Sequence, residues 1–108
     1  MLKYLPLILI LSSCAHTWNP LDYGVYPQQP IGSLVAISEL FDSEIHRICG
    51  KGKSGCVKQQ GKGYAIYYRN GDECALRHEL MHIMYGLKHT VAYMQRVISN
   101  VPNPGCPQ

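Results

Sequence analysis

The sequence predicts a small α+β domain with a core helix, a second helix that carries a polar motif and a short sheet, held together by disulfides. Three observations support this class. Apolar residues recur at helical spacing over 33–49, a run rich in aromatic residues over 64–69 is typical of a strand, and 74–85 contains no Gly or Pro. The chain has 108 residues, which is enough for one domain at most.

The N-terminal residues resemble a bacterial secretion signal. Lys3 precedes an apolar run over 4–11, which is shorter than the roughly 20 residues of a membrane-spanning helix but suits a signal peptide. The segment Leu11–Cys14 resembles the lipobox of bacterial lipoproteins, whose cysteine is acylated and becomes the new N-terminus. We therefore expect a lipoprotein signal peptide over 1–13 and a lipid such as palmitate on Cys14. The alternatives are an ordinary secretion signal with a free thiol, or an uncleaved anchor.

The residues after Cys14 suggest how the domain is attached to a membrane. Ala15 follows the cysteine, and by resemblance to Gram-negative lipoproteins an alanine there favours an outer-membrane lipoprotein facing the periplasm. Residues 14–32 contain three prolines and show no helical or strand period, so we expect a lipid-anchored tether that leads to a domain over 33–108. Three aromatic residues in this segment indicate that part of it packs on the domain or lies at the lipid interface.

Cysteine usage indicates an oxidising compartment. Lipid on Cys14 leaves an even set of four cysteines, which suits two disulfides in one of three connectivities. We favour Cys49 with Cys56, which closes the Gly/Lys loop between them. Cys74 then pairs with Cys106 and ties the end of the chain to the motif helix. The alternative makes Cys74 a metal ligand, although one further helical turn directs its thiolate away from the motif.

The elements before the motif are a helix, a loop and a strand. Ser33 is expected to cap a core helix that ends near Cys49, and His46 is expected on its surface. Residues 50–63 are turn material with a short strand around Val57, and Tyr64–Arg69 is predicted as a strand. The apolar stripe of the core helix consists of Leu34, Ile37, Phe41, Ile45 and Ile48.

Two helices complete the predicted domain. Asp72 is expected to cap the motif helix Cys74–Tyr85, and Gly86 to end it in a left-handed conformation. Thr90 is expected to cap a final helix that runs to about Asn100. After it, 101–108 is an irregular tail held by its disulfide. The inward face of the final helix is predicted to consist of Val91, Met94, Val97 and Ile98.

The motif helix contains the sequence HExxH, formed by His78, Glu79 and His82. Positions i and i+4 lie on the same face of a helix, so both histidines can direct an imidazole at one metal ion. Glu79 flanks that face, where a carboxylate can take a proton from a water that zinc acidifies. The alternative is a helix whose two histidines share a polar face or are satisfied by hydrogen bonds in the core.

A catalytic zinc commonly takes three protein ligands. No Asp or Glu follows Glu79 in the chain, which leaves His89 as the best candidate for the third ligand. Together with Gly86 these residues are similar to the pattern HExxHxxGxxH of metzincins, a subgroup of the zincin metallopeptidases. The similarity covers about a dozen residues, and three residues rather than two separate His82 from Gly86. The chain thus resembles zincins broadly. Met94 comes too soon to match the methionine turn of metzincins and is expected in the core.

The resemblance implies a zinc metallopeptidase with a zincin-like domain. His78, His82 and His89 would hold Zn²⁺, and Glu79 would act as general base and proton donor. It also implies an edge strand beside the cleft that pairs with extended substrate, and the strand over 64–69 directly precedes the motif helix. The expected substrates are peptides or proteins of the cell envelope. A hydroxyl that stabilises the oxyanion would come from Tyr67, Tyr68, Tyr85 or Tyr93.

Charge and size bear on the remaining hypotheses. The net charge of +3 falls to +2 without Lys3, and nothing resembles a nucleic-acid module, so no nucleic-acid partner is expected. Four lysines over 51–62 indicate a solvated loop rather than a patch for anionic ligands. Because about 95 residues leave little room to wall a deep cleft, the alternative function is a non-catalytic metal site for structure or partner recognition. A third hypothesis is hydrolysis of a non-peptide amide.

Overall fold

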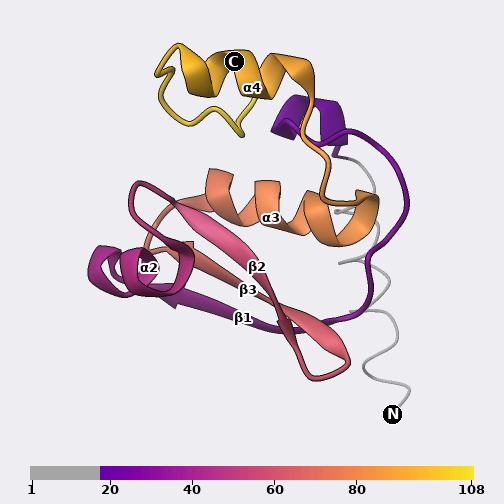
Figure 1. Ribbon diagram of the computed structural model, residues 1–108, viewed down its shortest axis with the longest axis vertical. Coiled ribbons are helices and arrows are strands. Elements are labelled where there is room, and N and C mark those ends of the chain that lie inside the picture. The colour runs from indigo at the N-terminus through magenta and orange to yellow at the C-terminus, as the bar shows by residue number, and fades with distance from the viewer. Residues whose placement is uncertain (1–17) are drawn as a thin grey trace.

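Residues 18–108 are described by the computed structural model, and their elements lie on either side of one central helix (Figure 1). The sheet lies below α3 in this view, and η1 and α4 lie above it. The predicted α+β class is confirmed. The predicted signal peptide over 1–13 and the lipid site at Cys14 lie outside the described residues. The elements are the 3-10 helix η1 (Pro20–Tyr23), β1 (Leu34–Leu40), α2 (Asp42–Cys49), β2 (Gly55–Gln60), β3 (Gly63–Arg69), α3 (Glu73–Tyr85) and α4 (Val91–Ile98).

The sheet has the strand order β1-β3-β2. β3 runs parallel to β1 and antiparallel to β2, and Gly61 and Lys62 form the tight turn of the β2–β3 hairpin. Gly61 has a φ of 60°, which suits a two-residue hairpin turn. The strand that directly precedes the motif helix is therefore central, and the edge strand that packs against α3 is β2. Lys and Gln side chains suit an edge strand. Because these residues are polar, most of β2 was predicted as turn material.

The core helix predicted from Ser33 to Cys49 is wrong over its first half. Leu34–Leu40 forms the strand β1, and α2 begins only at Asp42. The steps of three and four that predicted one helix join residues of two elements, and only α2 buries one of them. Ile45 of α2 is 1% exposed, whereas Ile37 of β1 is 48% exposed. The first four residues of β1 form an unbroken apolar run, which is typical of a strand in a parallel pair.

Helices α2 and α3 contact opposite faces of the sheet. A Cβ built at Gly55 of β2 would lie 3.4 Å from Cγ of Glu79 in α3. Side chains alternate along a strand, so the next residue, Cys56, points to the other face, where it is bonded to Cys49 at the end of α2. The predicted pairing of Cys49 with Cys56 is confirmed.

The core lies on both sides of α3. Ile66 of β3 and Met81 of α3 are both 0% exposed. Met81 packs with Tyr23 and Val25, which precede β1 in the chain. The segment predicted as a tether over 14–32 therefore contributes to the core from η1 onward, and the folded unit begins before residue 33.

Helix α4 begins where the sequence predicts but faces differently. Thr90 caps it, because its Oγ1 accepts a hydrogen bond from the N–H of Tyr93 at 3.0 Å. The predicted inward face is wrong, because a helical period defines an apolar face without placing a neighbour against it. On this face of α4 the exposed fractions are 74% for Val91, 45% for Met94, 41% for Val97 and 77% for Ile98.

No helix within residues 18–108 is long and apolar enough to cross a bilayer.

Candidate metal centre

The motif helix α3 starts at a cap that is fixed from two directions. Asp72 Oδ1 accepts from the N–H of Ala75 at 3.0 Å, and Oδ2 accepts from Nη2 of Arg69 at 2.9 Å. From this cap the helix runs between the sheet and η1, so it is covered on both sides. The motif residues are buried, with exposed fractions of 6% for His78, 7% for Glu79 and 4% for His82.

His89 reaches the same place through the turn after α3. Gly86 ends the helix with φ 112° and ψ 172°, a positive φ that favours glycine but lies outside the predicted left-handed helical conformation. The chain then runs beside the segment after η1, where Val25 and His89 form an antiparallel bridge. Gly24 O accepts from the N–H of Thr90 at 3.0 Å and fixes the other side of His89. The extra residue in the spacing is absorbed by this turn.

The imidazoles of the three histidines converge on one point. Nε2 of His82 lies 3.1 Å from Nε2 of His78 and 3.1 Å from Nε2 of His89. Ring nitrogens of all three lie within 4.8 Å of one another. Zinc–nitrogen bonds of about 2.0–2.1 Å in a tetrahedral site place ligand atoms roughly 3.3 Å apart, close to the two 3.1 Å separations from His82. The three residues form a group that could bind a metal ion.

Hydrogen bonds define which ring nitrogens face the centre. Nδ1–H of His78 donates to the carbonyl of Tyr23 at 2.5 Å, and Nδ1–H of His82 donates to the carbonyl of Gly86 at 2.8 Å. A carbonyl only accepts, so Nδ1 is protonated in both rings and neutral imidazoles direct lone pairs from Nε2 toward each other. Two lone pairs at 3.1 Å repel unless a cation lies between them. Carbonyl partners of this kind orient the histidine ligands of metal sites.

Burial keeps the imidazoles neutral. Burial, reinforced by neighbouring charges, lowers the pKa of His78 to about 3 and that of His89 to about 4. Burial also lowers the pKa of His82, against the opposing effect of its bond to Gly86. All three rings are therefore uncharged at neutral pH, which is the form that binds a metal ion.

Tyr93 of α4 covers the open side of the histidines. Its ring stacks on His89 at 4.2 Å and on His78 at 5.0 Å between centroids. Gly24 permits this contact, because a Cβ there would lie 2.6 Å from the ring of Tyr93. Burial raises the pKa of Tyr93, so its hydroxyl keeps its proton at neutral pH. Of the four tyrosines considered as oxyanion donors, Tyr93 is the one that lines the cavity beside Glu79 within the described residues.

Glu79 lines a cavity of about 370 Å³. Gly55 of β2 lies beside it: a Cβ there would lie 3.4 Å from Cγ of Glu79 and would collide with the carbonyl of Tyr67 at 2.8 Å. Burial raises the pKa of Glu79 to about 8, although the positive charge of Lys53 acts in the other direction. Without a cation nearby the carboxyl group therefore holds its proton at neutral pH.

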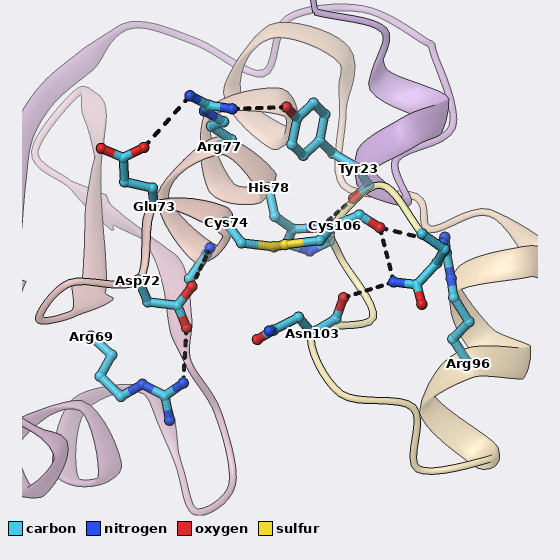
Figure 2. The surroundings of a disulfide bond; sticks show 12 residues. Tyr23, Arg69, Asp72, Glu73, Cys74, Arg77, His78, Arg96, Asn103 and Cys106 are labelled. Carbon is cyan, nitrogen blue, oxygen red and sulfur yellow. Dashed lines mark hydrogen bonds and ion pairs between the residues drawn. A yellow bond between two sulfur atoms is a disulfide. The ribbon is translucent and has the colours of Figure 1, made fainter.

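The C-terminal tail closes one wall of the centre. Cys106 is bonded to Cys74 in the first turn of α3, which confirms the predicted pairing and excludes the alternative in which Cys74 binds metal (Figure 2). The preceding residue, Gly105, packs on His78, where a Cβ would lie only 2.6 Å from Nδ1. The carbonyl of Cys106 also accepts from Nη1 of Arg96 in α4 at 3.4 Å. The tail thus links α3 to α4 across the site.

The sequence pattern did not reveal the residues that support the histidines. Tyr23 and Gly86 act through main-chain carbonyls, which any residue provides. Gly24 and Gly105 act by having no side chain, and no local spacing relates either one to the motif. His46 is exposed, as predicted, and lies outside the histidine group.

No protein-family model, curated protein or solved structure matches this chain. The site is therefore defined by its own geometry, as three neutral imidazoles beside a buried carboxyl group and a cavity.

Proposed function

We propose that the protein is a zinc-dependent peptidase, in which His78, His82 and His89 hold Zn²⁺ and Glu79 transfers the proton. The convergence of three Nε2 atoms, with two Nδ1–H groups already bonded to carbonyls, carries this proposal. Imidazole ligands suit zinc, although copper, nickel and iron also bind them. Bound zinc would polarise the scissile carbonyl and make water a nucleophile at neutral pH.

Glu79 is placed to hold and move a proton. Its pKa of about 8 results mainly from burial, and a nearby divalent cation would lower this pKa and leave a carboxylate. A carboxylate that lines the cavity can accept a proton from water and return it to the leaving amine. The proposal thus assigns Glu79 the roles of general base and then general acid.

Tyr93 and β2 provide groups that would orient the substrate. The Tyr93 hydroxyl is protonated and lines the cavity with Glu79, so it can donate to a developing oxyanion. In β2, Ser54 O accepts from the N–H of Arg69, and hydrogen-bonded residues alternate along an antiparallel pair. Gly55 and Val57 therefore direct main-chain groups away from β3, where an extended peptide can pair with them.

The metal site is tested by metal content. We expect near-stoichiometric zinc in the purified protein, sharp loss in His89→Ala and no loss in the matched control His46→Ala, which changes an exposed histidine. Metal is measured by mass spectrometry after dialysis against a weak chelator. Equal zinc in wild type and His89→Ala would contradict the assigned ligand set.

Catalysis is tested by Glu79→Gln in zinc-loaded protein. The wild type is expected to cleave an unfolded protein such as casein, and the variant to bind zinc normally but lose at least about 100-fold in kcat/KM, a typical contribution of general acid–base catalysis. Glu73→Gln is the matched control, because Glu73 lies on the same helix with 79% of its side chain exposed. Equal cleavage by wild type and Glu79→Gln would exclude the mechanism. Cell-wall fragments in a parallel assay test hydrolysis of a non-peptide amide.

The second candidate is a non-catalytic metal-binding lipoprotein that acts in partner recognition or structure. The raised pKa of Glu79 favours it, because a carboxyl group that stays protonated is not a base. The two candidates differ in the zinc-loaded state. If the protein binds zinc and cleaves no substrate, while Glu79→Gln changes neither property, the second candidate is supported.

We also propose that the protein acts in the bacterial cell envelope, anchored to the outer membrane by lipid on Cys14. Two disulfides support an oxidising compartment. The resemblance of Leu11–Cys14 to a lipobox supports the anchor. Mass spectrometry of the N-terminal peptide tests it, and an unmodified Cys14 would exclude it.

A further inference from the structure

The cavity beside Glu79 extends from the metal centre toward the start of α3. His78 and Glu79 line it at one end, and Asp72 and Ala75 line it at the other. One wall is the loop before β2, and the facing wall is α4 with the C-terminal tail. Its volume of about 370 Å³ lies within the usual range of small-molecule sites, which is about 300–1,000 Å³.

The charged side chains around this cavity leave one positive charge uncompensated. Asp72 already binds Arg69 and the start of α3. Glu79 is buried next to His78 in the helix, and neither it nor Asp72 forms an ion pair with a lysine within residues 18–108. Lys53 is exposed, lines the cavity and has no ion-pair partner among residues 18–108.

The position of Lys53 is set by the short loop that carries it. The Cys49–Cys56 disulfide closes this loop, and the N–H of Lys53 donates to the carbonyl of Gly50 at 3.3 Å. Lys53 lies two residues before Gly55, where a Cβ would lie 3.4 Å from Cγ of Glu79, and all three residues line the cavity.

The rest of the lining suits a short organic acid. Asn100 and Asn103 contribute amides, and Val97, Val101 and Pro104 contribute apolar surface. A ligand in the cavity can thus contact amide and apolar groups while its carboxylate faces the positive charge of Lys53.

We propose that this cavity binds a carboxylate of the peptide substrate next to the scissile bond, with the Lys53 ammonium as its counter-ion. The carboxylate belongs to an acidic side chain or to a free C-terminus, and both present the same group to Lys53. This inference rests on the proposed peptidase function, since it names the substrate class of that site. Lys51 and Lys58 are also exposed, but Lys53 is the lysine of this segment that lines the cavity within the described residues.

The first test measures kcat/KM of zinc-loaded protein on four peptides of one sequence. They carry Glu or Gln beside the cleaved bond, each with a free or an amidated C-terminus. We expect roughly a tenfold or larger preference for one carboxylate over its amide, as charge-assisted pairs provide. Comparison of the two arms identifies which carboxylate is bound.

Variants of Lys53 then test the counter-ion. Lys53→Ala is expected to reduce the preference to about one, and Lys53→Glu to reverse it in favour of peptides with Lys at the same position. Lys51→Ala is the matched control, because it removes a lysine from the same loop that does not line the cavity within the described residues, and it should keep the wild-type preference. A preference that is absent in the wild type, or unchanged in Lys53→Ala, would overturn the proposal.

The second test does not depend on catalysis. Lysines of the metal-free protein are labelled by ¹³C reductive methylation, which keeps their charge, and the protein is titrated with glutarate or its diamide. We expect the methyl signals of Lys53 to shift with glutarate only, and those of Lys51 to remain in place. Equal responses of the two lysines would refute carboxylate binding in the cavity. A specific Lys53 response in a protein that cleaves no peptide would instead disprove the peptidase function and leave the carboxylate site standing.

Discussion

Helices α3 and α4 form two walls of the same centre, but they are held in different ways. α3 buries six of its side chains between the sheet and η1, whereas none of the side chains of α4 is buried. α4 is joined to the site through the ring of Tyr93 and through the C-terminal tail, in which Cys106 contacts Arg96 and is bonded to Cys74. The motif histidines thus lie on a helix that is packed on two sides, whereas Tyr93, which covers them, lies on a helix with few packing contacts.

The largest difference should appear when a methionine is truncated in each helix. Met81→Ala in α3 removes a side chain that is 0% exposed and should cost about 2–5 kcal/mol of unfolding free energy. Met94→Ala in α4 removes one that is 45% exposed and should cost less than about 1 kcal/mol. Urea unfolding, with metal removed by a chelator, measures the loss of unfolding free energy in both variants. Equal losses would show that α4 is packed as tightly as α3.

Glu79→Gln should change how stability depends on pH. In the unfolded chain the pKa of Glu79 is about 4.5, and burial in α3 raises it to about 8. Between these two pKa values only the unfolded chain releases the proton. The contribution of Glu79 to folding stability is therefore fully present below the lower pKa and is lost as pH rises through the higher one. Each pKa unit corresponds to about 1.4 kcal/mol. The unfolding free energy of the variant, compared with that of the wild type, should therefore be higher at pH 8 than at pH 5 by up to a few kcal/mol.

Urea titrations of the metal-free protein at pH 5, 6.5 and 8 measure this change. Glu73→Gln serves as the control, since its side chain is 79% exposed and should leave the pH profile unaltered. A profile that Glu79→Gln also leaves unaltered would mean that Glu79 is not desolvated in α3.

Gly105→Ala tests how the tail holds the two walls together. The added methyl would lie 2.6 Å from Nδ1 of His78 and must displace either the ring or the tail. We expect stability to fall by about 1–3 kcal/mol, and zinc affinity by about 10- to 100-fold because the ligand loses its orientation. Pro107→Ala, at an exposed position of the same tail, should change neither quantity. Competition with a fluorescent chelator measures the affinity, and unchanged binding in Gly105→Ala would separate the tail from the centre.

The smallest effects are expected at the helix caps. Thr90→Ala and Asp72→Ala each remove a side chain that accepts from the first turn, at a typical cost of about 1 kcal/mol. Loss of Asp72 should lower the global stability, because α3 unfolds only with the core. Loss of Thr90 should instead raise amide hydrogen exchange in α4 alone. If protection against hydrogen exchange fell equally across the whole protein in both variants, α4 would unfold together with the core, as α3 does, and the contrast between the helices would be refuted.

Local chemistry in the sequence predicted a large part of this structure. The caps Asp72 and Thr90 and the strand β3 followed from residue types at short range, and the two disulfide pairs were favoured among three connectivities because Cys49 and Cys56 close a short loop. His89 was also predicted beside the motif histidines, because no Asp or Glu follows Glu79 and His89 was the best remaining candidate.

The errors arose where tertiary contacts decide the outcome. Ile37 and Ile45 fit one helical stripe, but only pairing with β3 determines that the first belongs to a strand. The apolar face of α4 was predicted to be buried, yet no element covers it within residues 18–108. The carbonyl of Tyr23 and the close approach of Gly105 are contacts across long stretches of chain, and no pattern in the sequence marks them.

The Cys74–Cys106 bond has a consequence for when the centre becomes complete. Cys74 lies one turn before His78, and Cys106 directly follows the glycine that packs on that imidazole. In a reducing compartment the thiols stay separate, and nothing covalent retains the last residues against α3. The covalent closure of the centre thus depends on oxidation of these two thiols, and a chain in which they are reduced holds this wall by non-covalent contacts alone.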